Sequence, residues 1–268
     1  MKDFLRQLVT ERKASGVDPR NISREYLQAR ILLSLQRSGA MVSIALHGGT
    51  ALRFLFAIPR FSEDLDFALE YVHHDFDFRR ILRRVLADLQ AEGYTVDIRL
   101  KESTPVLSGL IKFSGLPFEL GFSGRRSEIL RIKVEIDTNP PPGAGLKTTL
   151  IRRFVTLNLH HHDRSTLLSG KLHAILQRPW TKGRDLYDLM WYLSDPDWPE
   201  PNLIHLNNAL AQSGWEGPEV FSSNWREIVV AKVRDLDWPH VQADVRPFLE
   251  TRAEVDLFTA ENLVGLLA

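Results

Sequence analysis

The sequence predicts an α+β protein, with a mixed sheet and flanking helices in an N-terminal lobe and a helical C-terminal lobe. Three observations support this prediction. Helical periodicity dominates the first forty residues, segments between residues 43 and 137 alternate in polarity as strands do, and helical periodicity returns after residue 163. The segment 139–143, rich in Pro, marks the change in character. We therefore expect two domains, an α/β lobe at residues 1–158 and a helical lobe at residues 159–268.

Each element of the first lobe has a local signal. Asp18, Pro19 and Ser23 are start signals for a first helix, and Asp75 can cap a later one. Gly48 and Gly49 end a short apolar run, as happens where a strand gives way to a helix. Helices are therefore expected at residues 22–35, 50–56 and 76–90. Strands are expected at residues 43–46, 64–69, 94–100, 106–114 and 129–136.

The second lobe is predicted to consist of helices. Asp163 or Ser165 can cap a helix that ends at Gln177, and a second helix is expected at residues 184–193. Three closely spaced prolines then mark a joint, at Pro196, Pro199 and Pro201. The remaining sequence is rich in Trp, Leu and Val and is predicted to be helical.

The charge balance limits how this chain can bind nucleic acid. Lys and Arg total 34, as do Asp and Glu, so the net charge is zero and no global field attracts a polyanion. Any RNA contact must come from a local basic patch, although such patches are usually solvated surface. The candidates are the arginines between residues 79 and 84, together with Arg125, Arg126, Arg131 and Lys133.

Features that would place the chain in a membrane or outside the cell are missing from the sequence. There is no run of about 18 apolar residues, so no membrane span is expected. The N-terminus lacks an apolar signal core, which argues against secretion. Cysteine is absent, which excludes disulfides and thiol chemistry. We therefore expect a cytoplasmic protein.

The segment Gly48-Gly49-Thr50 is the first candidate binding element. A helix N-terminus opened by glycines presents unpaired N–H groups and the positive end of the helix dipole to a phosphate. Thr50 can cap the helix or donate its hydroxyl to phosphate. A tight turn without function is the alternative for the glycine pair.

Asp64 and Asp66 are the candidate metal ligands. Carboxylates at positions i and i+2 of a strand point to one face and can bind a hard divalent cation. Leu65 and Phe67 occupy the other face. The alternative is that the two acids simply face water.

A third carboxylate comes from the strand expected at residues 129–136. Glu135 shares a face with Lys133 and Asp137, because apolar side chains alternate with them. If this strand lies beside the strand of Asp66, Glu135 can complete a cradle for one or two Mg²⁺ ions, with Asp137 as the competing choice. Without a cation these acids would repel each other, so a purely structural cluster would be unfavourable.

Lys171 is the candidate phosphate ligand of the second lobe. It lies on the apolar side of its helix, where a lysine either extends its ammonium to solvent or meets a phosphate as a point charge. Asp185 and Asp188 share a face of the following helix. Alone they suggest a solvated ion-pair face, whereas near Lys171 they could orient the lysine or serve as a base.

Three adjacent histidines, His160, His161 and His162, suggest a metal site. Neighbouring side chains of a strand or loop do not converge on one ion, so we do not assign one here. We expect these histidines at the surface.

Taken together, these motifs resemble the AbiEii/AbiGii toxin family, whose members are nucleotidyltransferase-fold toxins of bacterial type IV toxin–antitoxin systems. The order and approximate spacing of the motifs match over residues 40–195. The matching segments are Gly48-Gly49-Thr50, Arg60-Phe61-Ser62-Glu63-Asp64-Leu65-Asp66-Phe67, Lys171, Arg178 and Arg184-Asp185-Leu186-Tyr187-Asp188. The C-terminal helices carry no motif that adds to this resemblance.

The resemblance implies a polymerase-β-like nucleotidyltransferase sheet with a metal site. Asp64 and Asp66 would bind Mg²⁺, for which Mn²⁺ is the alternative ion. Glu135 would be the third ligand, with Asp137 competing for that role.

The same resemblance implies how the nucleotide is bound and activated. The residues implied to bind nucleotide are Gly48, Gly49, Thr50, Ser62 and Lys171. The catalytic residues implied are Asp64, Asp66, Lys171 and Asp185, of which Asp185 would be the catalytic acid of the second lobe.

These assignments predict Mg²⁺-dependent transfer of a nucleoside monophosphate from an NTP to a hydroxyl acceptor. RNA is the expected acceptor, with the tRNA 3′ end in first place, and a cognate antitoxin is the expected protein partner. A glycosyltransferase that uses Asp64 and Asp66 to hold Mn²⁺ and a sugar nucleotide is one alternative, but it leaves Lys171 without a role. A non-catalytic protein of the same fold that binds nucleotide or a partner is the other.

Overall fold

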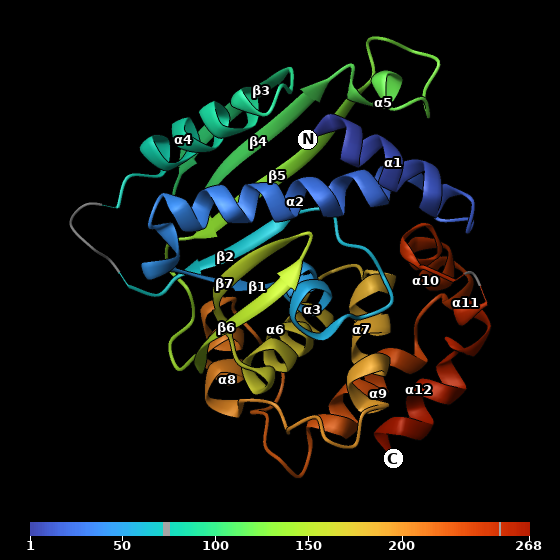
Figure 1. The fold of residues 1–268 in the computed structure, drawn as a ribbon. Helices are drawn as coiled ribbons and strands as arrows, with labels where there is room; N and C mark the ends of the chain where they lie inside the picture. Colours follow the sequence, from blue (N-terminus) through green and yellow to red (C-terminus); the bar gives the residue numbers. More distant parts are fainter. Residues whose placement is uncertain (72–75, 252) are drawn as a thin grey trace. The chain divides into compact units, whose positions relative to one another are not determined.

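The computed structural model describes residues 1–71, 76–251 and 253–268 (Figure 1). These residues form two compact units. The sheet unit comprises Met1–Ala57, Phe61–Pro140 and Thr148–His161, and the helical unit comprises Ile58–Arg60, Pro141–Lys147 and His162–Ala268. Two short segments that precede residue 158 in the sequence thus belong to the helical unit.

In the described residues, the sheet unit is built on seven strands in the order β3-β4-β5-β2-β1-β7-β6. Their bounds are β1 (Ile44–His47), β2 (Leu65–Leu69), β3 (Val96–Ser103), β4 (Val106–Ser114), β5 (Ile129–Asp137), β6 (Leu146–Arg153) and β7 (Val155–His162). β2 runs parallel to β5 and β1 runs parallel to β7, whereas β1–β2, β3–β4 and β4–β5 are antiparallel. This mixed sheet with flanking helices confirms the predicted fold class.

The helices of the sheet unit include two that cover one face of the sheet. They are α1 (Lys2–Lys13), α2 (Pro19–Arg37), the short 3-10 helix η1 (Ala40–Val42), α3 (Gly48–Phe56), α4 (Phe78–Ala91) and α5 (Leu116–Glu119). Helices α2 and α4 pack together against the strands β3 and β5 (Figure 1). Gly109 on β4 lies directly beneath α4, because a Cβ atom there would come within 2.5 Å of Leu82 Cδ1. Only glycine lets the helix approach the sheet this closely.

Strand β5 divides its side chains between the two faces of the sheet. Val134 is the register partner of Gly109 and is fully buried, as is Ile132. The alternate residues Lys133 and Glu135 point to the opposite face and are half-buried. The face that points away from α4 therefore carries charged side chains.

Two of these helices begin at aspartate caps. Asp18 accepts a main-chain hydrogen bond of 2.8 Å in the first turn of α2. The helix begins at Pro19, one of the predicted start signals, and Ser23 lies within it. Helix α4 is capped by Asp77, which accepts a main-chain hydrogen bond of 2.9 Å. The predicted cap of this helix, Asp75, lies outside the described residues.

Strands β6 and β7 are missing from the predicted elements. β6 is an edge strand with mostly exposed side chains, so it lacks the apolar face that marks a strand in sequence. β7 does alternate, since Leu157 and Leu159 are buried while Asn158 is exposed, and this period of two is the signal that could have identified it. The expected surface position is wrong for His161 and His162, which end β7 and are buried.

The helical unit contains the remaining helices. They are α6 (Arg164–Gln177), α7 (Gly183–Leu193), α8 (Leu203–Gln212), α9 (Trp225–Arg234), α10 (Trp238–Val245), the 3-10 helix η2 (Arg246–Phe248), α11 (Glu254–Leu257) and α12 (Ala260–Leu267). Asp163 caps α6 by accepting the Thr166 N–H at 2.8 Å, so Asp163 is the cap rather than Ser165. Within the described part of the chain, no helix has the length and hydropathy of a membrane span.

Candidate active site

Asp66 and Glu135 lie side by side on neighbouring parallel strands. The register pairs Asp66 of β2 with Glu135 of β5, and it pairs Asp66 with His47 of β1 on the other side. Neighbouring strands are about 4.8 Å apart, so the side chains of register partners can reach one small ligand. The two strands are therefore adjacent in the sheet, which confirms the condition on which the role of Glu135 depended.

The register also separates the two candidates for a third carboxylate. Glu135 is the partner of Asp66, whereas Asp137 is the partner of Ala68. Two residues along a strand correspond to about 7 Å, so Asp137 lies one repeat farther along the same face. Its Oδ1 accepts a hydrogen bond from the Asn139 N–H at 2.9 Å. The carboxylate beside Asp66 is therefore that of Glu135.

Asp64 immediately precedes β2 and is held through its main chain. The buried hydroxyl of Thr50 donates a hydrogen bond to the Asp64 carbonyl oxygen. Burial raises the pKa of the Asp64 carboxyl above its usual range, and the charge of Lys133 opposes this shift. Glu63 and Glu135 raise the same pKa further. A carboxylate held among other acids gains from a nearby cation.

Lys133 supplies positive charge to this acidic face. Its Nζ lies 2.8 Å from Glu135 Oε2, and this hydrogen bond raises the pKa of the lysine. The charges of Asp64 and Asp66 act on Lys133 in the same direction. The sequence places Lys133 on the face of Glu135, but the spacing alone predicts only a basic patch. Its role as the counter-ion of the acids becomes visible once β5 is paired with β2.

The glycine-opened helix lies directly beside Asp66. Gly48 is the first residue of α3 and has a φ of 70°, a conformation that side chains with a Cβ rarely adopt. A Cβ atom added at Gly48 would lie 3.1 Å from Asp66 Oδ2. The first N–H groups of α3, which have no partner within the helix itself, therefore begin next to the carboxylates.

Thr50 and Ser62 hold supporting positions in this region. Thr50 does not cap α3, because the helix already begins at Gly48. Its hydroxyl positions the main chain of Asp64 instead. The carbonyl oxygen of Ser62 accepts a hydrogen bond from Gln28 Nε2 at 3.1 Å. Direct contacts of Thr50, Ser62 and Gly49 with a nucleotide remain predictions.

The donor set suits a magnesium ion whose coordination is completed by its substrate. Among the described residues, no three His, Asp or Glu side chains are already gathered as a metal site. Mg²⁺ in nucleotide enzymes usually takes one or two carboxylates, together with waters and substrate phosphates. Asp66 and Glu135, together with Asp64 two residues before Asp66, supply oxygen ligands of this kind. The cradle of three carboxylates remains a prediction.

In the helical unit, Lys171 is buried between two carboxylates. Its Nζ lies 2.8 Å from Asp185 Oδ1 and 2.7 Å from Asp188 Oδ2. Burial alone would lower the pKa of Lys171, but the charges of the two aspartates hold it above its usual value. The ammonium therefore stays protonated. The alternative in which Lys171 extends to solvent is wrong, and the arrangement in which both aspartates orient it is the one observed.

Two arginines complete this network, of which Arg60 is buried and Arg178 is 38% exposed. Arg60 makes a two-point contact with Asp188, and Arg178 pairs with Asp185. Burial would raise the pKa of Asp185, but Lys171 and Arg178 hold that pKa below its usual range. Arg60 opens the motif at residues 60–67, but the surrounding sequence does not indicate a role for it. Its partner lies 128 residues later in the chain, beyond the reach of local patterns.

Comparison with known proteins identifies one matching family and several solved structures of similar fold. Residues 30–260 match the family model described as "Nucleotidyl transferase AbiEii toxin, Type IV TA system". No curated protein matches the chain. A Helicobacter pylori protein assigned as a nucleotidyltransferase is 19% identical with a TM-score of 0.60, over 94% of both chains.

Two further solved structures have the same fold. JHP933 from Helicobacter pylori is 18% identical with a TM-score of 0.57, over 94% of this chain and 91% of that one. MenT4, a nucleotidyltransferase toxin from Mycobacterium tuberculosis, is 16% identical with a TM-score of 0.50, over 99% of both chains. At these identities the likeness concerns the fold alone.

Proposed function

The chain belongs to the AbiEii nucleotidyl transferase toxin family of type IV toxin–antitoxin systems, and on that premise we propose that it transfers a nucleoside monophosphate from an NTP to the 3′-hydroxyl of an RNA. The family supplies the class of enzyme, an NTP as substrate and an antitoxin as partner. Dependence on Mg²⁺, the RNA acceptor and the roles of individual residues are our proposal. The tRNA 3′ end is the acceptor that we propose to test first.

One observation carries the proposal, namely the position of the α3 N-terminus beside Asp66 and Glu135. Phosphate oxygens are bound by helix N-terminal N–H groups, and a hard cation is bound by carboxylates. An NTP with its divalent ion needs both kinds of group next to each other. Membership of the family favours nucleotidyl transfer over the sugar-nucleotide alternative.

The sheet unit would bind the reacting end of the nucleotide. Asp66 and Glu135 would hold the ion with Asp64 as a further ligand, and Glu135 would exchange its contact with Lys133 for the ion. When bound, the ion lowers the pKa of the attacking hydroxyl and offsets the charge that develops on the phosphate. The first N–H groups of α3 would orient the phosphate chain.

Lys171 would neutralise phosphate charge, as a protonated ammonium does. Asp185 and Asp188 fix the position of its Nζ through the two contacts described above. The lowered pKa of Asp185 makes it a weak base, which favours positioning over deprotonation. We therefore assign Asp185 and Asp188 to positioning Lys171.

The transfer forms one bond and breaks one. The 3′-oxygen of the acceptor attacks the α-phosphorus, the bond from that phosphorus to the bridging oxygen breaks, and pyrophosphate leaves. The proton of the hydroxyl passes to solvent or to pyrophosphate. No oxidant or further co-substrate is needed.

Incubation of the purified chain with Mg²⁺, each labelled NTP in turn and total tRNA tests the proposal. We expect label in RNA, release of pyrophosphate, and loss of both with EDTA. Asp66→Asn should reduce the rate at least about 100-fold, because a ligand of the ion is lost. Asp97→Asn, which changes an exposed acid of β3, is the matched control and should label normally. Equal labelling by Asp66→Asn would contradict the proposal, as would no labelling of any RNA by the wild type.

A further inference from the structure

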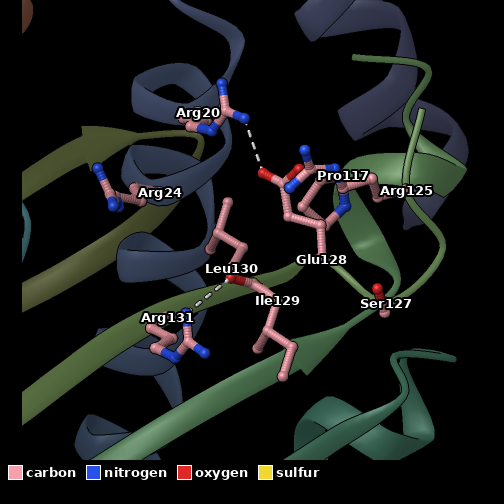
Figure 2. A pocket seen from close by; sticks show the side chains of 9 residues that line it. All are labelled: Arg20, Arg24, Pro117, Arg125, Ser127, Glu128, Ile129, Leu130 and Arg131. Atoms are coloured by element: carbon pink, nitrogen blue, oxygen red, sulfur yellow. Dashed lines mark hydrogen bonds and ion pairs between the residues drawn. The ribbon is translucent and has the colours of Figure 1, made fainter. Parts of the chain in front are cut away.

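An arginine-rich cavity lies in the sheet unit at the start of β5 (Figure 2). Its volume is about 450 Å³. The charged residues that line it are Arg20, Arg24, Arg125, Glu128 and Arg131. Four arginines and a single glutamate thus line this space, in a chain whose net charge is zero. We refer to these five residues and the space between them as the arginine cavity.

The four arginines come from three segments that are separate in sequence. Arg20 and Arg24 are one helical turn apart on α2, and both line the cavity. Arg125 belongs to the loop before β5, and Arg131 lies on β5 itself. The fold therefore gathers this charge, and the sequence shows only part of it.

Part of this positive charge is available to a ligand. Within the described residues, Arg125 and Arg131 form no ion pair, and Arg131 donates only a long hydrogen bond of 3.4 Å to the Ile129 carbonyl. Arg24 contacts Glu63 at 3.1 Å through Nη1, but its buried Nε has no hydrogen-bond partner among the described residues. Buried donors are nearly always satisfied in native proteins, so this one indicates a ligand or a water.

Arg20 shows how an anion would be held in the cavity. Its Nη2 lies 2.7 Å from Glu128 Oε1, and the Ser123 hydroxyl donates to the other oxygen at 2.5 Å. These two hydrogen bonds lower the pKa of Glu128, so its carboxylate stays charged. A phosphate oxygen offers the same kind of acceptor to a guanidinium. Glu128 therefore competes with any anion that approaches Arg20.

Two series of neighbouring residues lead from the arginine cavity toward the acidic site. On β5, Arg131 is two residues before Lys133 on the same face, and Lys133 pairs with Glu135. On the other wall, Arg24 contacts Glu63, which immediately precedes the first candidate metal ligand. A chain of phosphates bound in the cavity would thus end near the carboxylates.

We propose that the arginine cavity binds the sugar–phosphate backbone of the RNA acceptor, just before the 3′ end that enters the acidic site. This inference rests on the proposed function. Arginine suits the task because its planar guanidinium binds phosphate through two parallel hydrogen bonds. Four arginines spread over three segments suit the successive phosphates of a polymer better than a single triphosphate. The proposed site for the triphosphate is the α3 N-terminus.

The test is direct binding of a fluorescein-labelled RNA hairpin with a single-stranded 3′ tail, measured by anisotropy at several KCl concentrations. The double variant Arg125→Ala/Arg131→Ala should raise Kd roughly tenfold at low salt. It should also reduce the slope of log Kd against log salt by about 1.4, because each phosphate contact to a single strand contributes about 0.7. Both side chains are exposed, so folding should be unchanged, and a melting curve checks this.

A matched control removes the same charge elsewhere in the sheet unit. Arg37 at the end of α2 and Arg152 on β6 are exposed, do not line the cavity and belong to none of the candidate RNA patches. The double variant Arg37→Ala/Arg152→Ala should leave Kd and the salt slope near their wild-type values. An equal loss of affinity in both double variants would overturn the proposal, since only net charge would then matter.

Glu128 provides a variant with an effect of the opposite sign. Glu128→Gln removes the competing carboxylate and frees Arg20, so the hairpin should bind several times more tightly and with a steeper salt slope. Unchanged or weaker binding by Glu128→Gln would contradict the proposal. A loss of function through misfolding cannot produce the expected gain.

The same variants separate this inference from the proposed function. If the wild type labels RNA but the cavity variants bind and label RNA normally, the cavity inference is wrong and the function stands. If the hairpin binds as expected but no RNA is labelled, the function is wrong and the cavity remains an RNA site. If Arg125→Ala/Arg131→Ala weakens NTP binding, measured by calorimetry, and leaves hairpin binding unchanged, the cavity is a nucleotide site and the inference is overturned.

Discussion

At the scale of single residues, Gly48 is constrained both by its backbone and by its neighbour. Its φ is 70°, and an added Cβ would lie 3.1 Å from Asp66 Oδ2. Gly93 has a φ of 88° with nothing within 4 Å of the added Cβ. The two glycines therefore share a backbone requirement, and only Gly48 touches the candidate site.

This pair of glycines gives a prediction with its own control. Gly48→Ala and Gly93→Ala should each lower the free energy of unfolding by about 1–2 kcal/mol, because both force alanine into the left-handed region. Only Gly48→Ala should also reduce nucleotidyl transfer, by about tenfold or more, since it displaces the Asp66 carboxylate. Urea unfolding and the labelling rate measure the two effects. Equal transfer rates in the two variants would show that the close approach at Gly48 has no catalytic importance.

Asp64 gives a prediction about pH. Its pKa is raised by burial, so the folded protein binds this proton more tightly than the unfolded chain does. The resulting stabilisation is present below the usual pKa of about 4 and is lost as the pH rises through the raised value. Asp64→Asn should therefore raise the melting temperature at pH 7 in the absence of Mg²⁺. The difference should shrink at pH 3.5, where both side chains are neutral.

Addition of Mg²⁺ extends this test. The ion should raise the melting temperature of the wild type more than that of Asp64→Asn, because a ligand stabilises the state that binds it. Asp97→Asn should behave as the wild type throughout. A variant Asp64→Asn that melts below the wild type at pH 7 without Mg²⁺ would contradict the raised pKa of Asp64.

At the scale of secondary-structure elements, the link between Ile58–Arg60 and α7 depends on a buried ion pair. The side chains of Arg60 and Asp188 are 2% and 0% exposed, whereas Arg84 in the α4 pair with Asp88 is 58% exposed. Removal of Arg60 deletes two buried charged hydrogen bonds to Asp188, although Lys171 still pairs with that carboxylate. Removal of Arg84 affects only a pair that is largely exposed to solvent. Arg60→Met should therefore cost about 3–5 kcal/mol, and Arg84→Met about 0–1 kcal/mol.

The measurement must allow for two units. Urea unfolding followed by tryptophan fluorescence reports on the helical unit, and far-ultraviolet circular dichroism reports on both. Separate transitions would mean that each unit needs its own free energy. Losses of equal size in Arg60→Met and Arg84→Met would show that burial of the Arg60–Asp188 pair has no special weight.

The elements also show what the sequence can predict and why. Helix α4 has strong apolar periodicity, whereas α2 is buried on most sides. Both helices have aspartate caps, and both were predicted to within a few residues. The alternation of β5 identified Glu135 as a candidate before its neighbours were known. β6 escaped prediction because an exposed edge strand has no apolar face. Local patterns therefore predict most elements whose burial follows a period, although β7, which also alternates, was missed.

Contacts between distant segments could be predicted only in the form of an assumption, such as the pairing of two particular strands. The pairing of β2 with β5 decides between Glu135 and Asp137, and no property of either strand alone contains that register. The same holds for Arg60, whose partner Asp188 lies on α7, and for the arginine cavity, which combines α2 with β5. Side-chain chemistry was readable from the sequence, whereas the partner of each side chain required the fold.

At the scale of the whole molecule, the formal net charge is zero, but acidic and basic side chains lie in separate regions. Asp64, Asp66 and Glu135 make one face of the sheet acidic, and the arginine cavity lies farther along β5. Separated patches of this kind can steer and orient a polyanion without general attraction to nucleic acid. A metal ion at the acids would remove the local repulsion at the catalytic end. Charge distribution therefore matters more here than net charge.

Membership of a toxin family leads to a prediction for the intact chain in a cell. Induced expression of the wild type alone in a bacterial host should slow growth, and Asp66→Asn should abolish this effect, because toxicity by nucleotidyl transfer requires the ion site. Asp97→Asn is the matched acid variant and should remain toxic. Growth curves, with protein levels measured by immunoblot, give the comparison. If Asp66→Asn slows growth as much as the wild type at equal protein level, toxicity does not come from the transfer reaction, and binding of the intact chain to a cellular partner would have to explain it.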